Sequence, residues 1–348
     1  MNIHVVQSEK EAKAVASLAR RVFGPFIALF VQSSPKWAFY ATNEQSEMIG
    51  GVMLKRLTSD SAVVDFIFVG SAGRGQGVGP ALLDAALSSM SESGCTTQLA
   101  YIRDDNTPSW NMFAERGFHL PSIFKAYFGY GIRAFLDTIP VLFANHGYSL
   151  WVRTLQHPKP VTSPKPGVGI AAIFVLALLT TGIMGLGLGW DAWLPYAVPL
   201  VLGVTLMRLV LTWPFARRYG PVRFQVPHGG VPLSLGLAWL GVWWPVLGQW
   251  VPREAIWHES HFRSASGQAS LVGWLVTISA LAATYLAPDQ GMAENWRASL
   301  VPMLFYQAIP IGPFEGLDGF RVLKWSKPAF ILGAVVSAAL FVYGVVWG

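Results

Sequence analysis

The feature that most constrains this chain is an uncharged apolar stretch of 24 residues, Gly167–Trp190. About 20 apolar residues in a helix are enough to cross the roughly 30 Å hydrocarbon core of a bilayer. Further apolar runs follow it, at Trp193–Trp213, Gly229–Val251, Ala269–Ala287, Leu300–Ile311 and Ala329–Gly348. Tryptophans stand near the ends of several runs, as they do at membrane interfaces. The sequence therefore predicts an all-α, multi-span membrane domain over residues 167–348.

The charged residues divide the chain into two unlike halves. Residues 1–165 hold 27 charged side chains and residues 166–348 hold 17, although the second part is longer. Residues 157–166 contain four prolines and read as a stiff linker. We therefore expect a soluble domain at 1–156, a Pro-rich linker at 157–166 and the membrane domain after it. Cys95 is the single cysteine, which excludes a disulfide within the chain.

The basic residues that flank the apolar runs predict the membrane topology. They cluster in the linker, around Arg217–Arg223 and around Arg321–Lys327. Basic loops stay on the cytoplasmic side, and this is satisfied if Gly229–Val251 dips into the membrane and returns. We expect about five crossings plus one re-entrant segment. The start of the chain lacks the pattern of a signal peptide, so we expect the soluble half to be cytoplasmic.

The soluble half alternates strand-like and helix-like segments. Its strongest strand pattern is Ser61–Val69, which leads into the glycine-rich stretch Gly70–Gly79 and an apolar helical pattern that contains Pro80. Glycines allow a bulky anion to approach the backbone, and the N–H groups at a helix start point at it. A pyrophosphate is one interpretation and a simple turn is the other. The glycine spacing does not fit the Rossmann pattern, and no G-K-[ST] follows to make a P-loop.

Two motifs in this half resemble the GNAT acyltransferases. Arg74–Gly79 (RGQGVG) is similar to the signature with which that family holds the pyrophosphate of acetyl-CoA. Asn106–Phe118 (NTPSWNMFAERGF) is similar to its N-x-x-A-x-x-L-Y-x-x-x-G-F motif. The resemblance covers roughly residues 2–155 and implies an α/β fold, a GNAT-like mixed sheet with flanking helices, with acetyl-CoA as co-substrate.

The resemblance also implies roles for individual residues. Asp65 stands where many members carry a general base, although a solvated strand aspartate is an equal alternative. Phe113 replaces the tyrosine that often protonates the leaving thiolate, and Tyr101, Tyr127 or Tyr130 could substitute, each being better explained as a packing residue. The residues expected to contact acetyl-CoA are Val69, Arg74, Gly75, Gln76, Gly77, Val78, Gly79, Asn106, Ser109 and Phe113.

The second half resembles the intramembrane site-two protease family at two places. Gly316–Pro328 is similar to the L-D-G motif and the residues after it, and Leu211–Gly220 is similar to the stretch that follows the zinc helix. The positions of H-E-x-x-H are occupied by Arg208–Thr212 (RLVLT), so we expect no metal. Asp318 then has a structural role, and Arg208, costly inside a span, is predicted to pair with it. His258–His261 is interpreted as a polar surface loop.

These patterns favour a membrane-anchored N-acetyltransferase that uses acetyl-CoA and an amine the sequence does not identify. The alternative is a non-catalytic acetyl-CoA-binding sensor or assembly protein with a pseudoprotease membrane domain. The expected partners are acetyl-CoA, the lipid bilayer and a membrane protein. Nucleic-acid binding has little support, because the net charge of +6 lies largely in the linker and the membrane-flanking loops.

Overall fold

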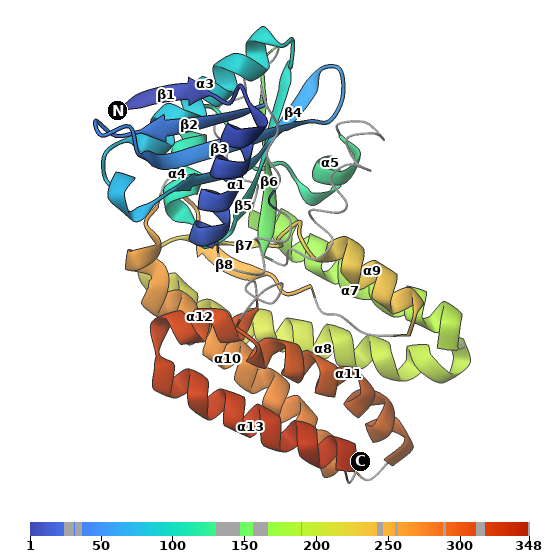
Figure 1. Ribbon diagram of the computed structural model, residues 1–348. Helices are drawn as coiled ribbons and strands as arrows, with labels where there is room; N and C mark the ends of the chain where they lie inside the picture. Colours follow the sequence, from blue (N-terminus) through green and yellow to red (C-terminus); the bar gives the residue numbers. More distant parts are fainter. Residues whose placement is uncertain are drawn as a thin grey trace.

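The computed structural model places a mixed sheet with its helices above a second, mainly helical half (Figure 1). It describes residues 1–23, 31, 37–129, 147–155, 166–188, 190–241, 246–254, 257–287, 290–310 and 317–346. The predicted linker lies outside the described residues except for its last residue, Pro166. Tyr130 also lies outside them.

Six strands form the sheet of the first half, in the order β1-β2-β3-β4-β5-β6. Only the β4–β5 pair is parallel. The strand bounds are Asn2–Val5, Ala38–Thr42, Met48–Arg56, Ser61–Val69, Thr97–Arg103 and Tyr148–Thr154. The predicted strand Ser61–Val69 is thus confirmed as β4, because a β-branched and aromatic run bounded by turns marks it.

Helices cover both faces of this sheet. A Cβ built on Gly50 would meet Val78 and Leu82 of α3 (Val78–Glu92), whereas one on Gly51 would meet Val15 of α1 (Glu9–Phe23). Successive strand residues point to opposite faces, so α3 and α1 lie on opposite sides. The mixed sheet with flanking helices that was predicted for this half is therefore confirmed. Two shorter helices, α4 (Thr107–Ala114) and α5 (Ile123–Phe128), follow β5.

A capping box starts α1. The amide N–H of Glu11 donates to Oγ of Ser8 at 3.3 Å, and the amide N–H of Ser8 donates to Oε2 of Glu11 at 3.0 Å. Two backbone donors that a helix start leaves unpaired are satisfied in this way.

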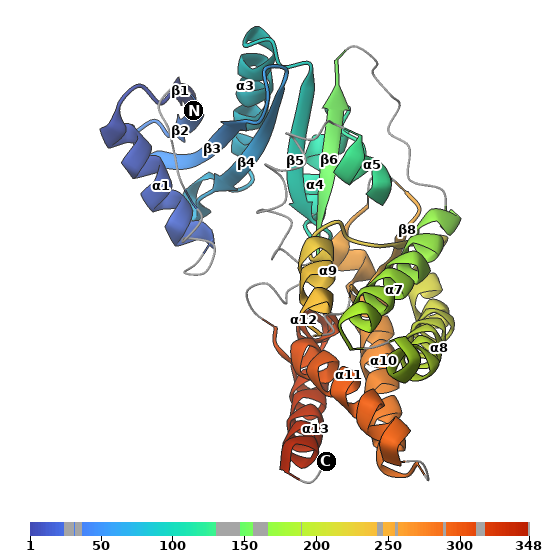
Figure 2. The same ribbon diagram turned by 90° about the vertical axis from the view of Figure 1, so that its right-hand side faces the viewer.

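The sheet opens between its two parallel strands. β4 pairs with β5 only from Ser61↔Thr97 to Val64↔Ala100, while β5 continues along β6 to its end. The pairing of β4 with β3 shifts at the same point, because Val64 faces Leu54 and Phe66 faces Met53, which leaves Asp65 as the extra residue of a β-bulge. Bulges bend a strand, and Figure 2 shows β4 diverging from β5.

The second half is mainly helical. It is not the all-α domain that the sequence predicted, because it also contains two strands. Strands β7 (Val222–Gln225) and β8 (Gln249–Pro252) form a two-stranded antiparallel sheet. Four-residue strands separated by more than twenty residues leave no periodic pattern, so the sequence did not reveal their pairing. The helices are α7 (Pro166–Leu188), α8 (Trp190–Ala216), α9 (Val231–Trp239), α10 (Glu259–Tyr285), α11 (Gln290–Ala308), α12 (Asp318–Trp325) and α13 (Lys327–Val346).

Three helical segments among the described residues are long and apolar enough to cross a membrane: Gly167–Leu186, Leu200–Tyr219 and Glu259–Tyr285. Lys327–Tyr343 is a shorter apolar segment. The run Gly229–Val251 does not form one long helix. Its helix, α9, has 9 residues, about 14 Å, and its end forms β8.

The two halves share one hydrophobic core. Buried residues of the second half, Trp257 and Phe262 among them, belong to the same cluster as Trp110 and Phe118 of the first half. The rings of Trp110 and Trp257 meet edge to face with centroids 5.6 Å apart. Hydrogen bonds fix the contact, because the N–H of Glu259 donates to Oγ1 of Thr107 at 2.9 Å. The start of α10 is therefore attached directly to α4.

Candidate functional site

The glycine-rich loop forms an anion cradle at the start of α3. Gly75 and Gly77 have φ of 75° and 73°, in the left-handed region, and a Cβ on either would meet open space. Gly77 is the N-cap residue. The N–H groups of Val78 and Gly79 lie in the first helical turn, where a helix supplies no internal acceptors. These donors and the helix dipole favour a phosphate at this place.

The two polar side chains of the loop are exposed. Gln76 curls back, and its Nε2 donates to the carbonyl of Ala72 at 2.9 Å. Arg74 is exposed beside it. A guanidinium held next to the helix N-terminus adds a mobile positive charge to the backbone donors.

The open edge of β4 presents backbone groups to the gap. The N–H of Gly70 donates to the carbonyl of Ile49, so the next pair, Val69↔Gly50, is a non-hydrogen-bonded pair. The N–H and carbonyl of Val69 therefore point away from β3. Because β4 and β5 have separated by this point, Val69 can hydrogen-bond to an extended ligand as another strand would.

Asp65 lies on the bulge at the apex of the gap and is half-buried. Burial raises the pKa of its carboxyl to about 6, although the positive charge of Lys55 opposes the shift. A carboxylate with a pKa close to the working pH can both accept and release a proton. This property agrees with a general base more closely than with a fully solvated aspartate.

The residues of the second motif divide between surface and core. Asn106 is the exposed N-cap of α4, and its side chain accepts a hydrogen bond from the N–H of Ser109 at 3.4 Å. Phe113 is 1% exposed and packs edge to face on Phe118 with centroids 5.0 Å apart. The structure therefore places Asn106 on the surface at the start of α4 and Phe113 in the core.

Two of the tyrosines considered as alternative acids, Tyr101 and Tyr127, pack in one cluster with residues of the helical half. The hydroxyl of Tyr127 is buried and donates to the carbonyl of His228 in the second half. Tyr101 is half-buried on β5 and packs with the clusters that contain Tyr127. These placements agree with the packing roles expected for both residues.

A buried polar junction, which no local sequence pattern indicates, joins the end of β5 to the second half. Asp104, 2% exposed, accepts hydrogen bonds from Oγ of Ser149 at 2.7 Å and from Nε2 of Gln225 at 3.0 Å. Burial raises the pKa of Asp104 to about 7. Burial acts on Asp105 in the same sense, but Arg103 and Lys324, which contact it, lower its pKa overall.

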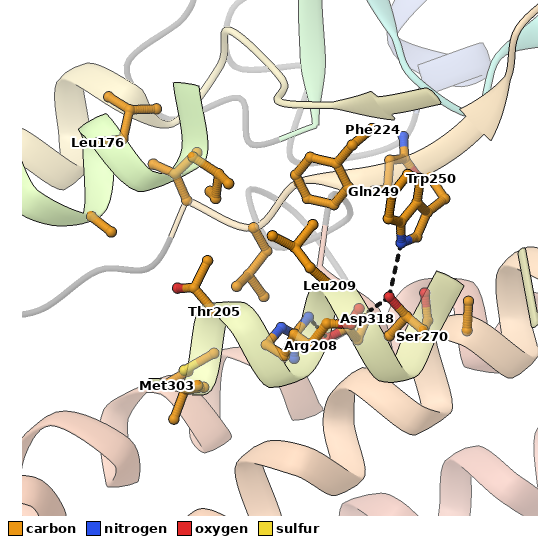
Figure 3. A pocket seen from close by; sticks show the side chains of 18 of the residues that line it. Leu176, Thr205, Arg208, Leu209, Phe224, Gln249, Trp250, Ser270, Met303 and Asp318 are labelled. Atoms are coloured by element: carbon orange, nitrogen blue, oxygen red, sulfur yellow. Dashed lines mark hydrogen bonds and ion pairs between the residues drawn. The ribbon is translucent and has the colours of Figure 1, made fainter. Parts of the chain in front are cut away.

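The predicted ion pair in the helical half is confirmed. Nη2 of Arg208 lies 2.5 Å from Oδ2 of Asp318, and Nη1 donates to the carbonyl of Gly273. Arg208, Leu209 and Thr212, which stand at the positions of H-E-x-x-H, line one cavity together with Asp318 (Figure 3). Within the ranges that the structure describes, no three His, Cys, Asp or Glu side chains are grouped to hold a metal ion.

Comparison with known proteins matches part of the first half to a known family. Residues 11–118 match the acetyltransferase (GNAT) family model. A Mycobacterium tuberculosis protein solved with CoA is 19% identical; the match covers 44% of this chain and 99% of that chain, with a TM-score of 0.33. N-acetylglutamate synthase of Neisseria gonorrhoeae, solved with CoA and N-acetylglutamate, is 17% identical. That match covers 45% of this chain and 35% of that chain, with a TM-score of 0.33. The IAA acetyltransferase of Bacillus cereus is 21% identical. That match covers 35% of this chain and 79% of that chain, with a TM-score of 0.29.

No curated protein matches the sequence. The family match ends at residue 118, inside the α/β half. A GNAT acetyltransferase domain therefore occupies residues 11–118, whereas the resemblance of the helical half to site-two proteases stays a prediction.

Proposed function

We propose that this protein is a membrane-anchored N-acetyltransferase that transfers the acetyl group of acetyl-CoA to an amine. The observation that carries the proposal is the gap between parallel strands β4 and β5, which opens beside the glycine-rich start of α3 inside the GNAT domain. A strand edge and a helix N-terminus at one gap offer what CoA needs, namely amide partners for pantetheine and donors for pyrophosphate.

The proposed contacts to acetyl-CoA are those that the family resemblance implies, and the open edge of β4 and the glycine-rich start of α3 support the contacts at Val69 and at the loop. The backbone of Val69 pairs with the pantetheine arm, and Asn106 contacts it from the opposite side, with Ser109 and Phe113 behind. The pyrophosphate lies on the loop, held by Arg74, Gly75, Gln76, Gly77, Val78 and Gly79.

Transfer begins with attack of the neutral amine nitrogen on the thioester carbonyl. Asp65, ionised above its pKa of about 6, accepts the proton that the nitrogen loses, directly or through water. A backbone N–H at the open edge of β4 stabilises the negative charge on the carbonyl oxygen. The C–S bond then breaks and CoA leaves as a thiolate, which takes its proton from solvent because Phe113 has none to give.

The helical half anchors the enzyme with the GNAT domain on the cytoplasmic side. In support, two predicted basic loops lie against the GNAT domain: Lys324 contacts Asp105, and Arg223 lies in the electrostatic range of Asp104. The positive-inside rule requires these basic loops to lie on the same side of the membrane. They do so if α7, α8, α10, α11 and α13 cross the membrane and α9 is the re-entrant segment.

The proposal is tested with Asp65→Asn. We expect kcat/KM for an accepted amine to fall about 10²-fold or more, and the rise of activity with pH near 6 to disappear. Calorimetric binding of acetyl-CoA should stay unchanged, because the carboxyl does not hold the cofactor. Asp60→Asn, in the exposed turn before β4, is the matched control. Equal activity of wild type and Asp65→Asn would contradict the assignment of the base.

The second candidate is a non-catalytic acetyl-CoA sensor, which the absence of a proton donor at Phe113 favours. A panel of small amines, lipid headgroup amines and peptide N-termini, read by release of free thiol, separates the two. Binding of acetyl-CoA with no thiol release from any amine would favour the sensor.

A further inference from the structure

The short helix α4 of the GNAT domain is hydrogen-bonded to the helical half. Figure 1 shows α4 at the base of the GNAT domain, next to the start of α10. Oγ1 of Thr107, the first residue of α4, accepts a hydrogen bond from the N–H of Glu259 at 2.9 Å. Four residues on, Nδ2 of Asn111 donates to the carbonyl of Trp257 at 3.1 Å, and Oδ1 of Asn111 accepts from the N–H of Trp257 at 3.4 Å. The segment that begins α10 is therefore bonded to two successive turns of α4.

The two residues before Asn106 are also held by the helical half. The carboxylate of Asp104 accepts a hydrogen bond from Nε2 of Gln225 in β7 at 3.0 Å, and Asp105 contacts Lys324 of α12. Asn106, the N-cap residue of α4, thus stands between residues that β7, α12 and the start of α10 hold in place. Asn106 itself is exposed, so its side chain is accessible to a ligand.

The length of α4 makes its position dependent on such contacts. It has 8 residues, about 12 Å, and helices this short are not stable on their own. Within the GNAT domain α4 is anchored farther along the chain. The ring of Trp110 packs on that of Trp151 in β6, and Arg116, beyond the C-terminal end of α4, pairs with Asp84 of α3. The N-terminal end of α4 therefore takes its position largely from the helical half.

We propose that the helical half positions Asn106 for the pantetheine arm, so that the affinity for acetyl-CoA depends on the contact between α4 and the start of α10. Thr107 and Asn111 are the positioning residues on the side of the GNAT domain. This role rests on the proposed function, because it takes Asn106 as a contact of pantetheine. The helical half is then a part of the cofactor site as well as an anchor. A conformational change at the start of α10 would alter the affinity for acetyl-CoA, and by linkage acetyl-CoA would strengthen the contact.

The test measures acetyl-CoA binding to the full-length protein in detergent by calorimetry. Thr107→Val keeps the shape of the side chain but removes the hydrogen-bond acceptor, and we expect it to weaken binding about fivefold or more. Thr107→Ser retains the hydroxyl and should bind within about twofold of wild type. Tyr127→Phe is the matched control, because it removes a hydrogen bond between the halves at α5, to the carbonyl of His228, and also preserves shape. It should leave the affinity within about twofold.

Steady-state kinetics distinguish positioning from a loss of folded protein. In Thr107→Val the KM for acetyl-CoA should rise while the KM for an accepted amine stays unchanged. A protein that is only partly folded would instead lose kcat with both KM values unchanged. Asn111→Leu, which removes both hydrogen bonds to Trp257, is a second variant and should give the same result if Thr107→Val does not fold.

Hydrogen exchange of the wild-type protein requires no variant. Acetyl-CoA should slow exchange of the amide of Glu259, which donates to Thr107, and should not change exchange in α9. If wild type binds acetyl-CoA and Thr107→Val binds it equally well, the positioning role is wrong and the proposed function stands. Equal weakening by Thr107→Val and Tyr127→Phe would also overturn it, because the effect would not be specific to α4. If wild type binds no acetyl-CoA, the proposed function fails and the positioning role fails with it.

Discussion

At the scale of single residues, the structure offers a matched test of the anion cradle. Gly77 and Gly94 lie at opposite ends of α3, both have positive φ, and a Cβ on either meets open space. Glutamate therefore imposes the same backbone strain at both places, but only at Gly77 does its charge repel the pyrophosphate. We expect Gly77→Glu to weaken acetyl-CoA binding by tenfold or more and Gly94→Glu to leave it within about twofold, measured by calorimetry. Equal effects would mean that the loop does not hold the cofactor.

The raised pKa of Asp104 predicts that the stability of the folded protein depends on pH. This pKa is about 7 in the folded protein and near the ordinary aspartate value of 3.8 in the unfolded chain, so the folded state binds more protons between these pH values. The free energy of unfolding should therefore fall as the pH rises from about 4 to 7 and level off above it. Asp104→Asn should flatten this slope and raise the stability at pH 8 by about 1 kcal/mol or more, measured as the thermal midpoint in detergent. An unchanged slope would contradict the assignment, and Asp60→Asn is the exposed control.

At the scale of elements, the open edge of β4 is available because successive residues of a strand point their N–H and carbonyl groups to alternate sides. The N–H of Val69 points into the gap and not toward β3. Val69→Pro removes this donor and no ladder hydrogen bond, as proline does on an edge strand. We expect acetyl-CoA affinity to fall about tenfold, whereas Val69→Ala should bind as wild type. If both variants bind alike, pantetheine does not pair with this strand.

The pair Arg208–Asp318 joins α8 to α12. Removing one partner leaves the other charge buried, so Arg208→Met should cost about 3–5 kcal/mol. The double variant Arg208→Met/Asp318→Leu should recover most of this loss, because neither charge remains. Thermal unfolding in detergent measures the recovery, and a double variant less stable than either single variant would show that the residues act independently.

At the scale of the whole molecule, the shared core predicts that the two halves stabilise each other. Trp110 of the GNAT domain packs against Trp257, and Asn111 donates to the carbonyl of Trp257 at 3.1 Å. A chain that ends after β6 would expose this surface. We expect it to unfold at a temperature several degrees lower than the GNAT domain in the full-length protein and to bind a hydrophobic dye. Equal midpoints would indicate that the contact adds no stability.

The GNAT domain and the apolar helices could be predicted from the sequence alone. Local signals encode both: Ser8 and Glu11 form a cap within one turn, Ser61–Val69 alternates as a strand, and Gly167–Leu186 is apolar over a bilayer's thickness. The roles proposed for Gly77 and Val69 come from the resemblance of Arg74–Gly79 and the strand before it to the GNAT motifs.

Only the tertiary structure decided what lies between the halves. The junction at Asp104, the two-stranded sheet β7–β8 and the cavity beside Arg321 join residues far apart in the chain. No local pattern encodes such contacts, because each partner contributes only one or two residues to them. The Arg208–Asp318 pair could be predicted at long range for one physical reason: a charge inside an apolar helix requires a partner, and few candidates exist.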